Sequence, residues 1–286
     1  MKRFSSAVNL LFLILLLLSC SSIPDKDKEE LLPIRPEIKL CTSSLEWNFL
    51  GDGIQYCKQE CPKIPLVFHL VKINLATPNL ELVCYPLSAD LSAEGSFPSK
   101  SPLEFARQNN AIVAINASPF DIPGFIFAQK RRLVGIYIAN GIELSSAVAK
   151  YGAIAFVPTE SSILKAKILK TQENIPQHSV YAFGGFFQIL LDGQVLSFNN
   201  TIIDSRMAVG VSEDDETLLV LFAEGEKQLK SEGLTFQESA YILKEVGAWN
   251  ALLLDGGASA AMVVDGINVA PYQSRKAANI LGFKFH

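Results

Sequence analysis

The sequence is short of the residues and motifs that several common chemistries need. Its 286 residues include only three histidines, His69, His178 and His286, and none of them adjoins a glycine-rich turn. No Gly-x-Ser-x-Gly motif is present, which argues against a Ser-His-Asp hydrolase. Neither a P-loop nor a Gly-x-Gly-x-x-Gly motif occurs, so a nucleotide cofactor has no support.

The sequence also lacks an excess of positively charged residues. Lys and Arg number 25 against 29 Asp and Glu, a formal net charge of −4, and no long basic run occurs. Nucleic acid is therefore not an expected partner. Only residues 7–19 form a long uncharged apolar run, which excludes a multi-span membrane protein. A hydrophobic fraction of 49% indicates a globular chain rather than a disordered one.

The first residues read as an export signal. Lys2 and Arg3 precede an apolar run that ends in Leu17-Leu18-Ser19-Cys20. This pattern resembles a bacterial lipoprotein signal at residues 1–19, in which Cys20 receives the lipid and becomes the mature N-terminus. An ordinary cleaved signal or an uncleaved anchor are the alternatives. The lipoprotein interpretation predicts an exported protein anchored to the bacterial cell envelope, on its periplasmic face or at the cell surface.

Three further regions follow the signal. Residues 20–38 are rich in alternating charge and proline, so they are expected to form the lipidated N-terminus and a flexible tether. Residues 39–63 form a cysteine-containing segment, and residues 64–286 are expected to form the main domain.

Cysteine usage fits export. Cys41, Cys57, Cys61 and Cys84 all fall in the first third of the mature chain. An oxidising compartment predicts two disulfides, in any of three pairings that the sequence does not distinguish. Cys57 and Cys61 lack the second closely spaced Cys or His pair that a zinc site needs, so no metal site is predicted.

The pattern of elements predicts the fold class. Strands are expected at 66–73, 80–84, 111–115, 133–139, 152–157, 187–191, 195–198, 207–211, 217–222, 251–254, 262–264 and 267–269. Ser101 with Glu104 and Thr235 with Glu238 have the spacing of capping boxes, which predicts helices near 102–109 and 236–246. Many strands with two clear helices favour a single α+β domain with a mixed, largely antiparallel β-sheet flanked by a few helices.

Polar residues gather where the expected strands end. Asn116 to Asp121 follow one buried strand, Glu224 ends another, and Arg206 directly precedes a third. Asp255 is followed by Gly256, Gly257, Ala258 and Ser259, a stretch too long for a two-residue turn. Because a rigid sheet holds such residues in place, strand ends are favoured positions for a site.

The order of these motifs resembles the phosphodiester glycosidase family. Asn116 to Asp121 is similar to the family's Asn-Gly-Gly-Phe-Phe-Asp, and Arg206 to Gly210 is similar to its Arg-Thr-Ala-x-Gly. Gly184-Gly185 with Asp192-Gly193, and Leu254 to Ser259, are similar to two further family segments. Arg275 and Asn279 fit the closing Arg and Asn of the family, so the resemblance extends from about residue 64 to the C-terminus.

The resemblance implies hydrolysis of a sugar-1-phosphodiester at the anomeric carbon, with a transition state like an oxocarbenium ion. The substrate would resemble a GlcNAc phosphodiester in an envelope or surface glycan. Asp255 would be the nucleophile or base, Glu224 the second carboxylate, and Arg206 the clamp on the phosphate. A carboxylate-bound Mg²⁺ or Ca²⁺ is compatible with such oxygen ligands, although no spacing demands one. The expected catalytic residues are Asp255, Glu224, Arg206 and Asp121, and the expected substrate-binding residues are Asn116, Gly184, Gly185, Gly256, Gly257, Ser259, Arg275 and Asn279.

Several positions depart from the family pattern. Ala117, Ser118 and Pro119 stand where the family has Gly-Gly-Phe, and Phe186 and Phe187 replace a Gly and a Pro. Glu224-Gly225-Glu226 stands where Asp-Gly-Arg is usual, and Ala258 replaces a glycine. These departures leave open a second hypothesis, a non-catalytic glycan-binding lipoprotein with the same fold.

Overall fold

The computed structural model describes residues 33–88, 95–122, 130–161, 163–225, 230–272 and 274–286. The signal at residues 1–19, Cys20, most of the tether and Glu226 lie outside these residues. In the described part of the chain, no helix is long and apolar enough to cross a membrane.

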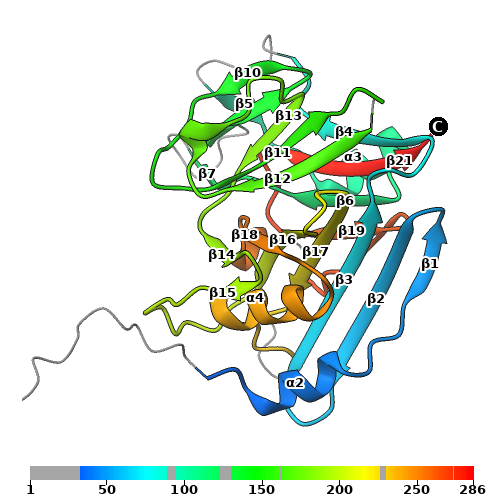
Figure 1. Ribbon diagram of the computed structural model, residues 1–286, viewed down its shortest axis with the longest axis vertical. Coiled ribbons are helices and arrows are strands. Elements are labelled where there is room, and N and C mark those ends of the chain that lie inside the picture. Colours follow the sequence, from blue (N-terminus) through cyan, green and yellow to red (C-terminus); the bar gives the residue numbers. More distant parts are fainter. Residues whose placement is uncertain (1–32, 89–94, 123–129, 162, 226–229, 273) are drawn as a thin grey trace, which may run out of the picture. The chain divides into compact units, whose positions relative to one another are not determined.

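The largest sheet contains eight strands in the order β1-β2-β3-β17-β16-β18-β14-β15, and each neighbouring pair in it is antiparallel (Figure 1). The cysteine-containing segment supplies β1, at the edge, and β2 next to it, and the two strands extend the sheet beyond β3. The strands of this sheet are β1 (Asn48–Gly51), β2 (Ile54–Cys61), β3 (Leu66–Asn74), β17 (Thr217–Ala223), β16 (Arg206–Val211), β18 (Asn250–Leu253), β14 (Gln188–Leu191) and β15 (Gln194–Val195).

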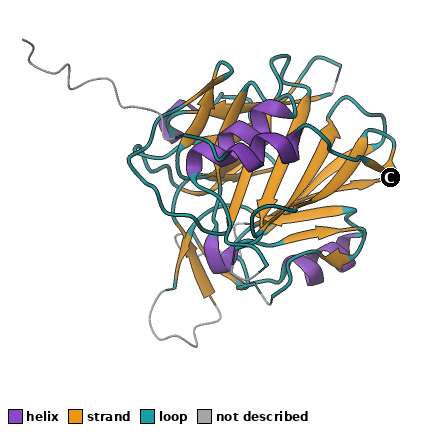
Figure 2. Cartoon of the chain, turned by 90° about the horizontal axis from the view of Figure 1, so that it is seen from below, coloured by secondary structure: helices purple, strands orange, loops and turns teal. Residues whose placement is uncertain are grey.

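Two helices cover one face of this sheet (Figures 1 and 2). They are α2 (Pro36–Thr42), which contacts β2, and α4 (Phe236–Glu245), which contacts β14, β16, β17 and β18. Phe68, Leu221 and Leu253 of the sheet pack with Ile242 and Leu243 of α4 in one buried cluster. The central strands are buried on both faces, which is why they read as continuous apolar runs.

The opposite face packs against two five-stranded sheets. One has the order β10-β9-β13-β11-β12 and the other β20-β19-β6-β21-β4, again with antiparallel neighbours. Val220, Phe222 and Leu252 meet side chains of both sheets in the main hydrophobic core. These strands are β4 (Leu80–Tyr85), β6 (Val113–Asn116), β9 (Tyr137–Ala139), β10 (Ile142–Ser145), β11 (Ala153–Pro158), β12 (Leu164–Leu169), β13 (Tyr181–Gly184), β19 (Met262–Val264), β20 (Ile267–Asn268) and β21 (Ile280–Phe285).

The remaining elements are short. Helix α3 (Pro102–Asn109) packs on β6, β19 and β21, and a three-stranded sheet has the order β5-β8-β7. Its strands are β5 (Ser96–Pro98), β7 (Phe120–Asp121) and β8 (Lys130–Leu133). In the described ranges, 3₁₀ turns occur at η2 (Gln172–Asn174) and η3 (Gly257–Ser259).

The predicted α+β fold with largely antiparallel sheets is confirmed. The capping box of α4 is present, because the Thr235 side chain accepts from the Glu238 N–H and the Glu238 carboxylate accepts from the Thr235 N–H. Asp192-Gly193 and Asp265-Gly266 both adopt positive φ, as two-residue hairpin turns of this type require.

Three local predictions were wrong. The Ser101 side chain makes no capping hydrogen bond, so α3 begins at Pro102 without the expected box. The expected strand at 133–139 is split into β8 and β9, and Gly135 between them has a φ of +120°. Among the four described cysteines one disulfide forms, Cys41–Cys61, because Cys57 and Cys84 are buried in clusters on opposite faces of the large sheet.

Candidate active site

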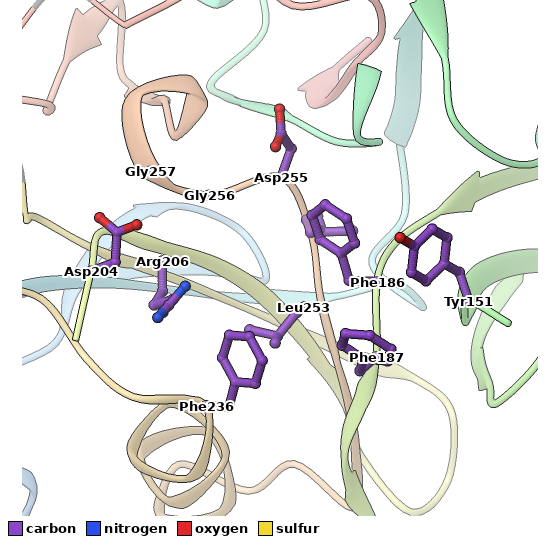
Figure 3. A pocket seen from close by; sticks show the side chains of 11 residues that line it. Tyr151, Phe186, Phe187, Asp204, Arg206, Phe236, Leu253, Asp255, Gly256 and Gly257 are labelled. Atoms are coloured by element: carbon purple, nitrogen blue, oxygen red, sulfur yellow. The ribbon is translucent and has the colours of Figure 1, made fainter. Parts of the chain in front are cut away.

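A cleft of about 330 Å³ opens where β16 and β18 meet the end of α4 (Figure 3). Asp255 is near one end of the cleft in this view, and the Arg206 guanidinium lies beside Phe236 at the other. The cleft is lined by Tyr151, Phe186, Phe187, Asp204, Arg206, Phe236, Leu253, Leu254, Asp255, Gly256 and Gly257.

Asn116 fixes the backbone at Asp255. Its Nδ2 donates to the Asp255 carbonyl at 2.7 Å, and its Oδ1 accepts from the Ala261 N–H at 2.8 Å. The Asp255 N–H donates in turn to the Ala117 carbonyl at 3.0 Å. Asn116 therefore ties the end of β6 to the loop after β18, and both polar atoms of its side chain have partners within the protein.

The carboxyl group of Asp255 lies in a partly buried position. Burial raises its pKa from 3.8 to about 7, and the hydrogen bond from Ser259 and the positive charge of Arg275 counteract that rise. The Arg275 N–H donates to the Ala258 carbonyl at 3.0 Å, which holds this exposed residue beside the loop. Asp255 can thus hold or release a proton near neutral pH.

Arg206 is locked at the start of β16. Its Nε donates to the Leu234 carbonyl at 2.8 Å, and its Nη2 donates to the Ile202 carbonyl at 2.5 Å. The guanidinium carbon lies 4.7 Å from the centroid of the Phe236 ring. Burial lowers the pKa of Arg206, and Asp204 acts in the opposite direction. The five N–H groups of a guanidinium leave further donors available for an anion in the cleft.

Asp204 adds a second carboxylate to the cleft, which the sequence-based list of site residues omitted. Its Oδ1 accepts from the Ser205 N–H at 2.7 Å, and its Oδ2 lies close to Gly257. The signal in the sequence was the Asp204-Ser205-Arg206 run before β16. The pairing of residue 204 with Leu234, which places it at the cleft, is visible only in the fold.

The glycines after Asp255 permit close backbone approach. A Cβ on Gly256 would lie 2.8 Å from the Ser205 carbonyl oxygen, and Gly257 has a φ of +55°. The Gly257 N–H donates to that same carbonyl at 2.9 Å. Gly185 serves a similar purpose elsewhere, because a Cβ there would lie 2.5 Å from the Leu253 carbonyl oxygen. Gly184 lies beside the Gln172 side chain.

Glu224 does not line the cleft. Arg206 pairs with Ala223, so the two side chains share one face of the sheet and Glu224 follows on the other. The Glu224 carboxylate accepts a hydrogen bond at 2.9 Å from His69 Nε2, and His69 Nδ1 lies 2.7 Å from the Tyr56 hydroxyl. The structure thus places the expected second carboxylate in a buried hydrogen-bonded chain.

The remaining expected site residues are spread out. Asp121 forms an exposed ion pair with Arg132 at 3.0 Å and borders a different depression. Asn279 is buried, and it accepts from the Ser118 N–H and donates to the Ser118 hydroxyl. Ser259 is also buried, and its side chain hydrogen-bonds to Asp255. Within the described ranges, no three His, Cys, Asp or Glu side chains group as ligands for a metal ion.

The structure defines an α+β protein with a cleft that holds an aspartate of raised pKa and an arginine. The profile of the phosphodiester glycosidase family matches residues 109–284, more than half of the chain. This chain belongs to the phosphodiester glycosidase family. No curated protein matches the sequence.

Solved structures share the fold at low sequence identity. The zebrafish N-acetylglucosamine-1-phosphodiester α-N-acetylglucosaminidase catalytic domain, auto-inhibited by its pro-peptide, has a TM-score of 0.59 and 16% identity, covering 85% of this chain and 82% of that one. A hypothetical protein from Synechocystis has a TM-score of 0.61 and 16% identity over 85% of this chain. The match spans 64% of the Synechocystis chain, less than two thirds. A Burkholderia pseudomallei protein has a TM-score of 0.59 and 12% identity, covering 79% of this chain and 74% of that one.

Proposed function

We propose that this protein hydrolyses a sugar-1-phosphodiester, of the GlcNAc-phosphodiester type, at the anomeric carbon. The observation that carries the proposal is the cleft itself, which holds Asp255, with a pKa near 7, and Arg206 at separate positions. A sugar-1-phosphodiester presents an anomeric carbon next to a phosphate anion. Asp255 can act on the carbon, and Arg206 can bind the anion.

In the proposed reaction, Asp255 acts in its ionised form as nucleophile or general base at the anomeric carbon. The bond between that carbon and the phosphate oxygen breaks, and the electron pair leaves with the phosphomonoester. Water supplies the hydroxyl of the free sugar, by direct attack or by displacing the Asp255 carboxylate from the sugar, and its second proton passes to Asp255 or to solvent. A phosphate is a fairly stable leaving anion, so it needs less protonation than an alcohol does.

Arg206 binds the phosphate in this scheme and stabilises the charge that develops on it. Its contacts with Leu234, Ile202 and Phe236 hold the guanidinium in place before the substrate arrives. Ser259 and Arg275 stabilise the ionised form of Asp255. Asp204 takes the place that the sequence assigned to Glu224, since it is the carboxylate that shares the cleft with Asp255.

We further propose that the protein acts while anchored to the cell envelope through a lipidated Cys20, on glycan phosphodiesters of the envelope or surface. The support is the Lys2-Arg3 start, the apolar run and Leu17-Leu18-Ser19-Cys20. The charged, proline-rich segment after Cys20 would give the domain a short reach from the membrane.

The test uses the full-length chain and a panel of sugar-1-phosphodiesters that includes GlcNAc, with and without Mg²⁺ or Ca²⁺. Free sugar and free phosphomonoester are assayed separately. We expect both products in equal amounts, and Asp255→Asn to lower turnover by about 10²–10⁴-fold. Asp265→Asn, in a hairpin turn where Asn also tolerates positive φ, is the matched control and should keep its activity.

Two results would contradict the proposal. Full turnover by a folded Asp255→Asn protein would remove Asp255 from the chemistry. No release from any member of the panel, together with capture of the same glycans, would favour the non-catalytic glycan-binding lipoprotein instead.

A further inference from the structure

An uninterrupted row of aromatic rings runs along the cleft. Tyr151 contacts Phe186 and Phe187 with ring centroids 5.3 and 5.6 Å apart, and Phe187 lies 6.4 Å from Phe236. Phe236 in turn stacks on the Arg206 guanidinium. Figure 3 shows these rings along one side of the cleft, between the Asp255 end and the Arg206 end.

Further apolar residues lie next to this row and next to Arg206. Phe198 contacts both Phe187 and Phe236, at 6.1 and 5.4 Å, which completes a triangle of three rings. The loop whose Ile202 carbonyl holds Arg206 carries two exposed aliphatic side chains. Ile202 is 63% exposed, Ile203 40% and Phe187 40%, unusual values for side chains of this type beside a site.

The two ends of the aromatic row differ. At the Tyr151 end, the exposed Lys150 ammonium lies 4.8 Å from the ring centroid and keeps that end in contact with water. At the Phe236 end, Arg206 stacks on the ring and donates to the carbonyl of the exposed Ile202, which Ile203 follows in the chain. Aromatic faces can stack against a sugar, but exposed isoleucines do not, because they offer neither a flat face nor a partner for a hydroxyl. The outer part of the surface therefore suits an apolar group.

The order of groups in a phosphodiester indicates which part of the substrate this apolar group is. With the sugar at Asp255 and the phosphate on Arg206, the next group along the chain is the aglycone. From these positions, and resting on the proposed function, we infer that the preferred substrate carries an apolar aglycone, an alkyl or isoprenoid alcohol esterified to the sugar phosphate. Phe187, Phe198, Phe236, Ile202 and Ile203 form its binding surface, named below the aglycone surface.

The test compares substrates that differ only in the aglycone. The full-length chain is given α-GlcNAc-1-phosphate esterified to methyl, butyl or hexyl alcohol, each kept below the concentration at which it forms micelles. We measure kcat/KM for hydrolysis and, separately, Kd by calorimetry. A buried chain gains up to about fourfold per methylene, so we expect kcat/KM to rise at least about tenfold from methyl to hexyl.

Two variants sharpen the test. Ile202→Ser and Phe187→Ala remove parts of the aglycone surface and should lower the ratio of hexyl to methyl kcat/KM several-fold. Both side chains are well exposed, so neither change threatens the core. Ile267→Ser is the matched control, because Ile267 is 66% exposed on β20 and lines no part of the cleft. It should leave the ratio unchanged.

Each outcome separates this inference from the proposed function. Hydrolysis of all three substrates at similar kcat/KM overturns the inference and leaves the proposed function standing. A chain-length effect that Ile267→Ser reduces as much as Ile202→Ser also overturns it. If no substrate is hydrolysed, the proposed function fails, and the inference about the surface is then decided by Kd. Tighter hexyl binding that Ile202→Ser abolishes supports it, and equal Kd values overturn it.

Discussion

Asp255 and Glu224 both end buried strands, yet the fold gives them opposite surroundings. Asp255 follows β18 into a loop at the cleft, where burial outweighs the hydrogen bond from Ser259 and the charge of Arg275 and raises its pKa to about 7. Glu224 follows β17 on the other face of the sheet, where His69 donates a hydrogen bond to it at 2.9 Å. A buried hydrogen-bonded carboxylate away from the cleft contributes to stability, whereas a carboxylate at the cleft with a raised pKa is suited to proton transfer.

Apart from that of Asp255→Asn, the largest effect on kcat/KM is expected at Arg206, which shares the cleft with Asp255 while Glu224 does not. Arg206→Lys loses the planar fork, the stacking on Phe236 and the bond to Leu234, so kcat/KM should fall by about 10²–10³-fold. The measurement is kcat/KM for the methyl phosphodiester. Arg132→Lys, in an exposed ion pair, is the control, and a similar fall there would contradict the role of Arg206.

The next largest effect is the pH dependence of Asp255. Because the ionised form is the reactive one in the proposed scheme, kcat/KM should rise with pH and level off above about 7. Between pH 8 and pH 5 the expected fall is about a hundredfold, from the ionised fraction alone. A rate that instead declines above neutral pH would make Asp255 the general acid.

Substitution of the two carboxylates should change the free energy of unfolding in opposite directions. The pKa of Asp255 is higher in the folded chain than the ordinary 3.8, so the folded state binds more protons between about pH 4 and pH 7. The free energy of unfolding therefore decreases as pH rises through this window. Asp255→Asn removes this decrease and should stabilise the protein at pH 8 by about 1–3 kcal/mol, discounted for partial exposure.

Glu224→Gln should act in the opposite direction. It weakens a buried, charge-assisted hydrogen bond to His69 and should destabilise the protein by about 1–3 kcal/mol while activity per folded molecule is kept. The test is urea unfolding at pH 8, in which the midpoint and slope are measured for both variants. Stabilisation by Glu224→Gln, or loss of its activity in the folded state, would refute the comparison.

The smallest effect is expected at Asp121. Its carboxylate pairs with Arg132, and both side chains are 56% exposed, so Asp121→Asn should change the free energy of unfolding by less than about 1 kcal/mol. Its kcat/KM should stay at the wild-type value, because the residue borders a different depression. A large loss of kcat/KM would restore Asp121 to the catalytic residues that the sequence predicted.

Local sequence patterns were enough to predict much of the fold. The apolar runs that became β16, β17 and β18, the capping box of α4 and the Asp-Gly turns depend on neighbours within a few residues. The split at Gly135 was not visible in the pattern, because the glycine faces the Gln172 side chain from a distant segment. The free state of Cys57 and Cys84 likewise depends on tertiary packing, which buries the two thiols in different clusters.

For the candidate site, the sequence by itself determined which polar residues stand at strand ends and, through the order of the motifs, the family. Only the tertiary structure decided which of them meet. It brought Asp204, Arg206 and Asp255 to one cleft, used Asn116 and Asn279 as internal ties, and turned Glu224 to the other face. The physical reason is that strand order and the alternation of side chains fix a residue's face, and both depend on pairings across the whole chain.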